Sequence, residues 1–142
     1  MSVIVKIQKF CCYQDRSEYE VRRKLKTFPI SLEEQNQIVE QLIFDKFIDD
    51  QRFAVSFVNG KMNTKGWGVL KIKNGLTQKG ISSKIIQETL KEIEGAKFEQ
   101  ILLKEIEKWK RSYQLSSETK PKLIRFLLSK GFTYNEIMNN LK

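Results

Sequence analysis

The chain has 142 residues, which is enough for one ordinary domain or a few very small modules. It carries 26 Lys and Arg residues against 17 Asp and Glu residues, an excess that favours a polyanionic partner, although a charge that only keeps the protein in solution gives the same count. It has no histidine, so the commonest general base and the commonest metal ligand are both missing.

The cysteines and the apolar segments favour a cytoplasmic location. Cys11 and Cys12 are adjacent, which disfavours a normal disulfide between them and provides no spaced set of metal ligands. No apolar run reaches the roughly 18 residues that span a bilayer, and the opening "MSVIVKIQKF" lacks the longer apolar core of a signal peptide. We therefore expect a protein without a membrane segment.

Helical patterns run along the whole chain, whereas strand patterns are sparse. The first amphipathic segment is Ile4–Tyr13, and Ser17 with Glu20 then forms a capping box that opens the helix "EYEVRRKLK". Further amphipathic segments follow at Gln51–Met62 and Phe98–Tyr113. The pattern predicts an all-α fold.

Three short breaks divide the chain at equal intervals. They read "TFPIS" at 27–31, "QKGIS" at 78–82 and "SKGFT" at 129–133, and an offset of 51 residues superimposes them. The same offset aligns apolar residues, namely Val21 with Ile72 and Leu123, Leu25 with Leu76 and Leu127, and Ile30 with Ile81 and Phe132. The chain therefore holds three copies of one unit.

Each break contains residues that end one helix and begin another. Gly80 and Gly131 can adopt the left-handed conformation that stops a helix, whereas Pro29 replaces this glycine in the first copy. The predicted helix caps are Ser17, Ser31, Asp49, Ser82 and Thr133. Glu34 and Glu136 stand three residues after their caps and predict two further capping boxes.

An amphipathic segment precedes each pair of helices, so the repeat is three helices long. The predicted repeats are residues 1–48, 49–96 and 97–142. The offset fails in the first helix of each repeat, so these helices or their entry loops differ in length. A unit of this size buries little surface alone, and stacking would let neighbouring copies share a core, which predicts an elongated, curved molecule.

The stretch "FDKFIDDQRFA" places two adjacent aspartates between two helices. Asp49 is a candidate N-cap of the next helix, and Asp50 falls in the first turn, near the positive end of the helix. A metal site or an acid–base pair is the sharper alternative, but no third ligand or partner lies nearby in the sequence. We interpret the pair as the boundary between two helices.

Positive charge is concentrated in the middle repeat. Residues 51–87 contain seven basic residues and no acidic residue, and Lys61 and Lys65 lie in the glycine-containing approach "NGKMNTKGWG". Such a surface fits either phosphates or an acidic protein groove, and Trp67 could stack on a base or anchor the core. The candidate partner-binding or DNA-binding residues are Arg52, Lys61, Lys65, Trp67, Lys71, Lys73, Asn74, Gln78 and Lys79.

The run "FIDDQRFAVSFV" followed by "KGWGVLKIKNGLTQKGIS" resembles the central signature of the RecX family, bacterial regulators of the RecA recombinase. The resemblance implies a protein that binds the RecA filament on single-stranded DNA and restrains ATP hydrolysis and strand exchange in recombination, DNA repair and the SOS response. We expect a monomer, and weak direct binding to DNA stays open. The resemblance also implies no catalytic residue, metal or cofactor, and the chain lacks a phosphate-binding loop of its own.

Two other classes of protein stay open at this point. A helix-turn-helix regulator acting directly on DNA would read a defined DNA site, usually as a symmetric dimer, and helices that end in "QKGIS" resemble its turns. A nuclease would need clustered carboxylates or a metal-binding set, which the basic segment lacks. We therefore expect a regulatory protein without enzymatic activity.

Overall fold

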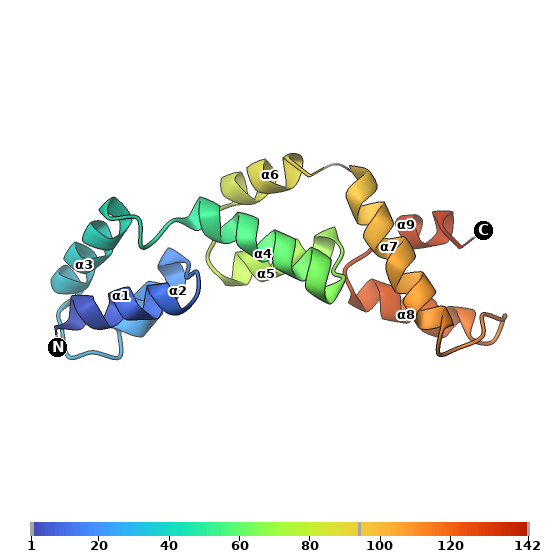
Figure 1. Cartoon of the computed structure of the whole chain (residues 1–142), viewed down its shortest axis with the longest axis horizontal. Helices are drawn as coiled ribbons and strands as arrows, with labels where there is room; N and C mark the ends of the chain where they lie inside the picture. Colours follow the sequence, from blue (N-terminus) through green and yellow to red (C-terminus); the bar gives the residue numbers. More distant parts are fainter. Residues whose placement is uncertain (1, 94, 142) are drawn as a thin grey trace. The chain divides into compact units, whose positions relative to one another are not determined.

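The computed structural model describes residues 2–93 and 95–141, and within these residues the chain forms nine α-helices and no strand (Figure 1). The helices are α1 (Val3–Tyr13), α2 (Glu18–Leu25), α3 (Leu32–Phe44), α4 (Asp50–Lys65), α5 (Val69–Gln78), α6 (Ser83–Lys91), α7 (Gly95–Lys110), α8 (Lys120–Ser129) and α9 (Tyr134–Asn139). They correspond in order to three units of three helices, which confirms the predicted fold class.

The predicted caps stand at the helix starts. The Ser17 and Thr133 hydroxyls each form a complete capping box, with Glu20 and Glu136 respectively. The remaining three caps each accept one backbone N–H of the first turn, at 3.1 Å for Ser31, 3.0 Å for Asp49 and 3.3 Å for Ser82. In the described part of the chain the box at Ser31 is only half formed, because the return bond from the Ser31 backbone to Glu34 is missing.

Helix α4 is longer than its apolar pattern predicts. It continues beyond the predicted Met62 to Lys65, so Lys61 and Lys65 both lie on a helix. A glycine inside a helix costs about 1 kcal/mol relative to alanine, which the remaining turns of a 16-residue helix can absorb. Conversely, α7 ends at Lys110, before the predicted Tyr113.

The first repeat contains its own buried cluster. Its members are Ile7, Cys11, Val21, Leu25, Val39, Leu42 and Ile48, which come from all three helices and the segment that follows them. Burial raises the pKa of the Cys11 thiol to about 11, so at neutral pH it stays protonated and packs as a small apolar group. Cys12 is exposed, and both cysteines are free, as their adjacency predicts.

The chain divides into two compact units, one of residues 1–56 with 76–89 and one of residues 57–75 with 90–142. Within each unit a lysine–glycine pair meets the middle helix of the preceding repeat. Gly80 (φ 76°) lies so close to Tyr19 that an added Cβ would be 2.5 Å from the tyrosine Cβ, and Gly131 (φ 99°) approaches Lys71 equally closely. These glycines therefore stop a helix, as predicted, and also admit a neighbouring helix.

The lysines of these pairs also bind the preceding repeat. Lys79 Nζ lies 3.1 Å from Glu20 Oε2, and Lys130 Nζ donates to the backbone carbonyl of Lys65 at 2.8 Å. At the second of these contacts the backbones bond directly, because Gly68 N–H donates to the Lys130 carbonyl at 2.7 Å and Leu70 N–H donates to the Gly131 carbonyl at 3.1 Å. The start of α5 is thus held by the end of α8.

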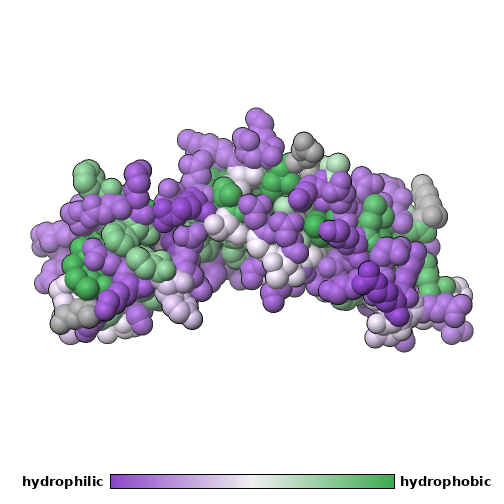
Figure 2. Space-filling model, in the orientation of Figure 1, coloured by the Kyte–Doolittle hydropathy of each residue, from purple (hydrophilic) through white to green (hydrophobic). Residues whose placement is uncertain are grey.

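Hydrophilic residues cover most of the face drawn in Figure 2, with smaller hydrophobic areas between them. Several large apolar side chains are exposed, among them Phe44 and Leu32 of α3. None of the helices described is both long enough and apolar enough to cross a membrane.

Replacing Gly131 with alanine should destabilise the fold, because the new Cβ would meet the Lys71 backbone at 2.6 Å and the residue would keep a left-handed φ. We expect a loss of at least about 1 kcal/mol in the free energy of unfolding, measured by urea denaturation. Gly60→Ala is the matched control, since nothing lies within 4 Å of the added Cβ and alanine favours a helix. Equal stability of the two variants would show that the close approach at Gly131 is unimportant.

Candidate functional site

Trp67, in the short connection between α4 and α5, lies beside two of the basic residues predicted from the sequence. Lys61 Nζ lies 4.9 Å and Lys71 Nζ 4.6 Å from the centroid of its ring, within the range of cation–π attraction. Phe57 packs against the same ring edge-to-face, with centroids 6.2 Å apart. Half-buried Trp67 therefore anchors this packing and also holds two ammonium groups in one place.

Two further lysines join this arrangement. Lys65 ends α4, and its carbonyl accepts the hydrogen bond from the Lys130 ammonium. We call Lys61, Lys65, Trp67, Lys71 and Lys130 the Trp67 cluster. Lys130 comes from the third repeat and was not predicted, although the 51-residue offset places it opposite Lys79, so the repeat itself was the available signal.

The remaining predicted residues of α5 are exposed but do not belong to the Trp67 cluster. Lys73, Asn74 and Gln78 lie on the solvent side of the helix, whereas Ile72 and Leu76 are completely buried. This division follows the helical periodicity of the apolar residues in α5.

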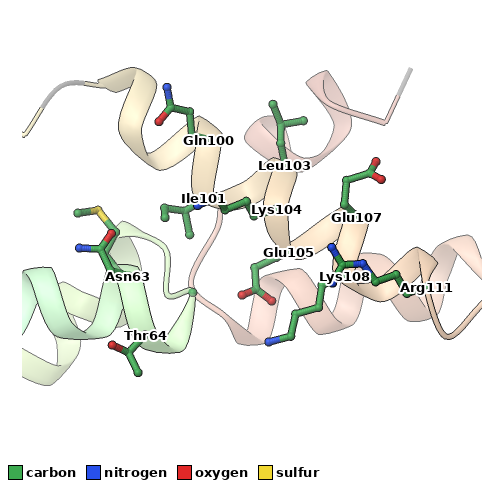
Figure 3. Close-up of a pocket in the computed structure, with 12 residues that line it drawn as sticks. Asn63, Thr64, Gln100, Ile101, Leu103, Lys104, Glu105, Glu107, Lys108 and Arg111 are labelled. Atoms are coloured by element: carbon green, nitrogen blue, oxygen red, sulfur yellow. The ribbon is translucent and has the colours of Figure 1, made fainter.

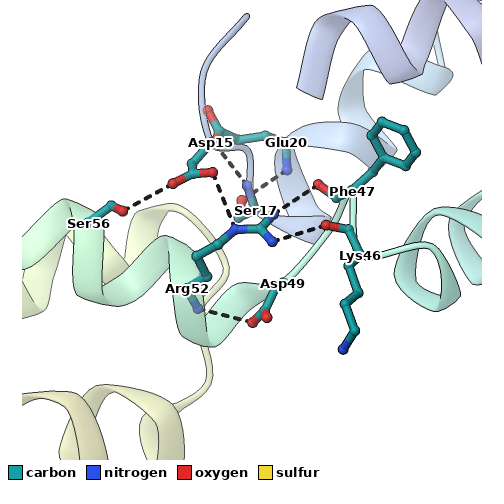
Figure 4. Close-up of polar contacts among 8 residues, drawn as sticks. All are labelled: Asp15, Ser17, Glu20, Lys46, Phe47, Asp49, Arg52 and Ser56. Atoms are coloured by element: carbon teal, nitrogen blue, oxygen red, sulfur yellow. Dashed lines mark hydrogen bonds and ion pairs between the residues drawn. The ribbon is translucent and has the colours of Figure 1, made fainter. Parts of the chain in front are cut away.

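Arg52 and Lys79, which were also predicted to bind a partner, have partners within the chain. Arg52 Nε lies 3.4 Å from Asp15, and its guanidinium donates to the carbonyls of Lys46 and Phe47 at 3.0 and 3.3 Å (Figure 4). Lys79 pairs with Glu20, as described above. Residues 51–87 contain no acidic residue, but carboxylates of the first repeat pair with two of the seven basic residues in this segment.

The two aspartates of "FIDDQRFA" serve different helices. Asp49 caps α4, its own helix, by accepting the Arg52 N–H. Asp50 instead accepts the backbone N–H of Glu18 at 2.8 Å and so caps α2 of the first repeat. The pair is structural, as predicted, and it joins the first repeat to the start of the second.

The surroundings of Asp50 at this junction alter its acidity. Burial raises the pKa of its carboxyl, the hydrogen bond from Glu18 N–H opposes this rise, and the nearby Glu18 and Asp49 carboxylates add to it. The net direction is upward from 3.8, so the folded chain holds the Asp50 proton more tightly than the unfolded chain does.

No group of three or more histidine, cysteine or carboxylate side chains among residues 2–93 and 95–141 is arranged to hold a metal ion. The chemistry available at the Trp67 cluster is instead the binding of negative charge by pre-positioned ammonium groups.

A family model, sequence relatives and solved structures all match this chain to the same family. The family model described as "RecX, second three-helix domain" matches residues 49–90. A protein of Finegoldia magna named "Regulatory protein RecX" is 35% identical over 131 residues, which are 89% of this chain and 63% of the relative. One of the same name from Streptococcus gordonii is 33% identical over 127 residues, which cover 87% of this chain and 48% of the relative. The chain thus spans about half to two-thirds of the length of these relatives.

Solved structures match almost the whole chain. The crystal structure of RecX from Lactobacillus salivarius superimposes with a TM-score of 0.84 at 30% identity, covering 96% of this chain and 90% of that chain. A second structure, a crystal structure of regulatory protein RecX, gives a TM-score of 0.82 at 27% identity and covers 96% and 70% respectively.

Replacing Asp50 with asparagine should preserve the cap of α2, because the amide oxygen can still accept the Glu18 N–H. Asp50→Ala lacks that acceptor and should unfold about 1 kcal/mol more easily than the parent at neutral pH. Urea unfolding of the parent and both variants measures the differences.

The pH dependence provides a second test of the Asp50 cap. Between 3.8 and the raised folded pKa the unfolded chain releases the proton and the folded chain retains it, so the stability of the parent relative to Asp50→Asn should fall as pH rises through that window. A parent that gained stability over Asp50→Asn with rising pH would show that the folded chain favours the carboxylate.

Proposed function

The chain belongs to the RecX family, and from this premise we propose that it regulates RecA by binding the RecA filament on single-stranded DNA. In this proposal it mainly inhibits the ATPase and strand-exchange activities of the filament, and it acts as a monomer without catalysis of its own. The ATP whose hydrolysis it affects belongs to RecA, and the regulator works in the cytoplasm, where the filament forms.

The observation that carries the proposal is the Trp67 cluster. Four of its five residues lie in the segment 49–90 that the family model matches, and two of its ammonium groups are held over one tryptophan ring. A filament on single-stranded DNA offers both DNA phosphates and acidic protein side chains as partners for such groups. Charge-assisted contacts to these groups are stronger than neutral hydrogen bonds, and the cluster supplies its cations already in place.

The regulator inhibits RecA if it binds most tightly to a state of the filament that hydrolyses ATP slowly. A ligand shifts an equilibrium only by the difference in its affinity for the two states, so the regulator must bind the inactive arrangement of RecA subunits more tightly. Contacts with both RecA and DNA would supply that difference, because their relative positions change when strands are exchanged. Binding to free DNA then contributes less than binding to the assembled filament.

Reversing the charge of the Trp67 cluster should weaken this binding. We expect the double variant Lys61→Glu, Lys71→Glu to bind RecA-coated DNA at least about tenfold more weakly and to lose inhibition of strand exchange, as each close charge contact contributes more than 1 kcal/mol. If both lysines contact phosphates, the slope of the logarithm of the binding constant against the logarithm of the salt concentration should decrease in magnitude by about one for each lysine. Loss of the three cation–π contacts that Lys61 and Lys71 make with Trp67 and Phe57 should cost no more than about 1 kcal/mol of stability each.

The matched control is the double variant Lys6→Glu, Lys9→Glu in the first repeat. Lys6 also lies over an aromatic ring, with its Nζ 5.7 Å from the Phe28 centroid, so the control removes a similar contact and the same charge. It should inhibit RecA nearly as well as the parent. If the Lys61, Lys71 variant inhibited RecA as strongly as the parent, the binding face would lie in another part of the chain. The same conclusion would follow if only the first-repeat control lost inhibition.

A further inference from the structure

A hollow of about 790 Å³ lies between the end of α4 and helix α7 (Figure 3). Its wall is apolar at Met62, Ile101 and Leu103 and polar at Asn63, Thr64 and Gln100. Three basic side chains of α7 or its end, Lys104, Lys108 and Arg111, complete the lining together with the exposed Glu107. The hollow thus combines a cationic rim with an apolar floor.

Glu105 is the unusual residue of this wall. Only 6% of it is exposed, and its Oε2 has no hydrogen-bond partner among the described residues. Figure 3 shows its carboxylate pointing from α7 towards the end of α4. There its other oxygen occupies the notch left by Gly66, where an added Cβ would clash with it. Burial of a polar oxygen without a donor is unfavourable, so a ligand that brings a donor to this oxygen would be stabilised by the new hydrogen bond.

The charges around Glu105 restrict what such a ligand can be. A simple anion would be repelled by the buried carboxylate, and a cationic side chain or metal ion would be repelled by the three basic side chains at the rim. The ligand must therefore present neutral N–H donors at one end and negative charge at the other. A nucleotide within a DNA strand has this form, since its base carries the donors and its phosphates carry the charge.

We propose that this hollow binds one unstacked base of single-stranded DNA, with guanine preferred, and that Glu105 accepts the N–H donors of the base while Lys104, Lys108 and Arg111 contact the flanking phosphates. The proposal concerns direct contact with DNA and does not depend on RecA.

Guanine is preferred because its Watson–Crick edge carries two adjacent donors, the N1–H and the N2 amino group. A carboxylate facing this edge meets no acceptor between them. In cytosine and adenine the amino group lies beside a ring acceptor, and in thymine the single N–H lies between two carbonyls, so each of these bases brings an acceptor close to Glu105. Glu105 Oε2 is shielded from solvent, so the base reaches it only when a neighbouring side chain moves. Lys108, which lines this hollow and a second one of about 420 Å³ that Glu105 also lines, is exposed and can move aside to admit the base.

The test is the affinity of the full chain for labelled single-stranded oligonucleotides, measured by fluorescence anisotropy at one fixed salt concentration without RecA. Three oligonucleotides of equal length are compared: thymine alone, thymine with isolated guanines, and the same strand with inosine in place of each guanine. We expect the guanine strand to bind at least about fivefold more tightly than the thymine strand, as a bidentate base contact contributes about 1–3 kcal/mol of discrimination. Inosine, which lacks the N2 amino group, should lose most of this gain.

Two substitutions on α7 assign the preference to one carboxylate. Glu105→Gln keeps the size of the side chain and should abolish the guanine preference, whereas Glu107→Gln, which removes an exposed carboxylate from the same hollow, should preserve it. Circular dichroism establishes that each variant is folded, and the comparison of inosine with guanine tests the parent chain even if Glu105→Gln fails to fold. Equal affinity of the parent for all three strands, full gain with inosine, or an unchanged preference in folded Glu105→Gln would each overturn the proposal.

Discussion

The close approach of a lysine–glycine pair to the preceding repeat is the contact on which the rest of the structure depends. A three-helix unit of this size has little apolar surface to bury, so consecutive repeats must be joined by short contacts. At Gly80 and Gly131 only the missing side chain leaves room for the neighbouring helix, and Lys79 and Lys130 then reach back to Glu20 and to the Lys65 carbonyl. Backbone groups at helix ends that would otherwise lack hydrogen-bond partners bond to residues of the next repeat.

This arrangement explains why the Trp67 cluster is not a property of the middle repeat alone. The start of α5, directly after Trp67, is bonded to Lys130 and Gly131 of the third repeat. The same contact positions Lys71 against Gly131 and brings the Lys130 ammonium to the end of α4. A change at the glycine contact should therefore disturb the position of the basic groups as well as the stability of the fold.

The all-α fold and the helix starts could be predicted from the sequence because both depend on residues a few positions apart, such as Ser17 with Glu20. Long-range contacts could not be predicted in this way. Asp50 caps a helix 32 residues earlier, and Asp15 and Glu20 neutralise Arg52 and Lys79 from another repeat, so local charge counts overstated the free cations. The repeat boundaries, the elongated outline and the roles of the predicted binding residues remain predictions.

We propose that the chain recognises the assembled filament rather than RecA or DNA alone. A direct test compares its affinity for single-stranded DNA coated with RecA, for the same DNA alone and for RecA alone, at one fixed salt concentration. We expect the tightest binding to the coated DNA, because phosphates and protein carboxylates lie together there. Equal or tighter binding to the naked DNA would contradict the proposal and would identify the chain as a protein that acts on DNA directly.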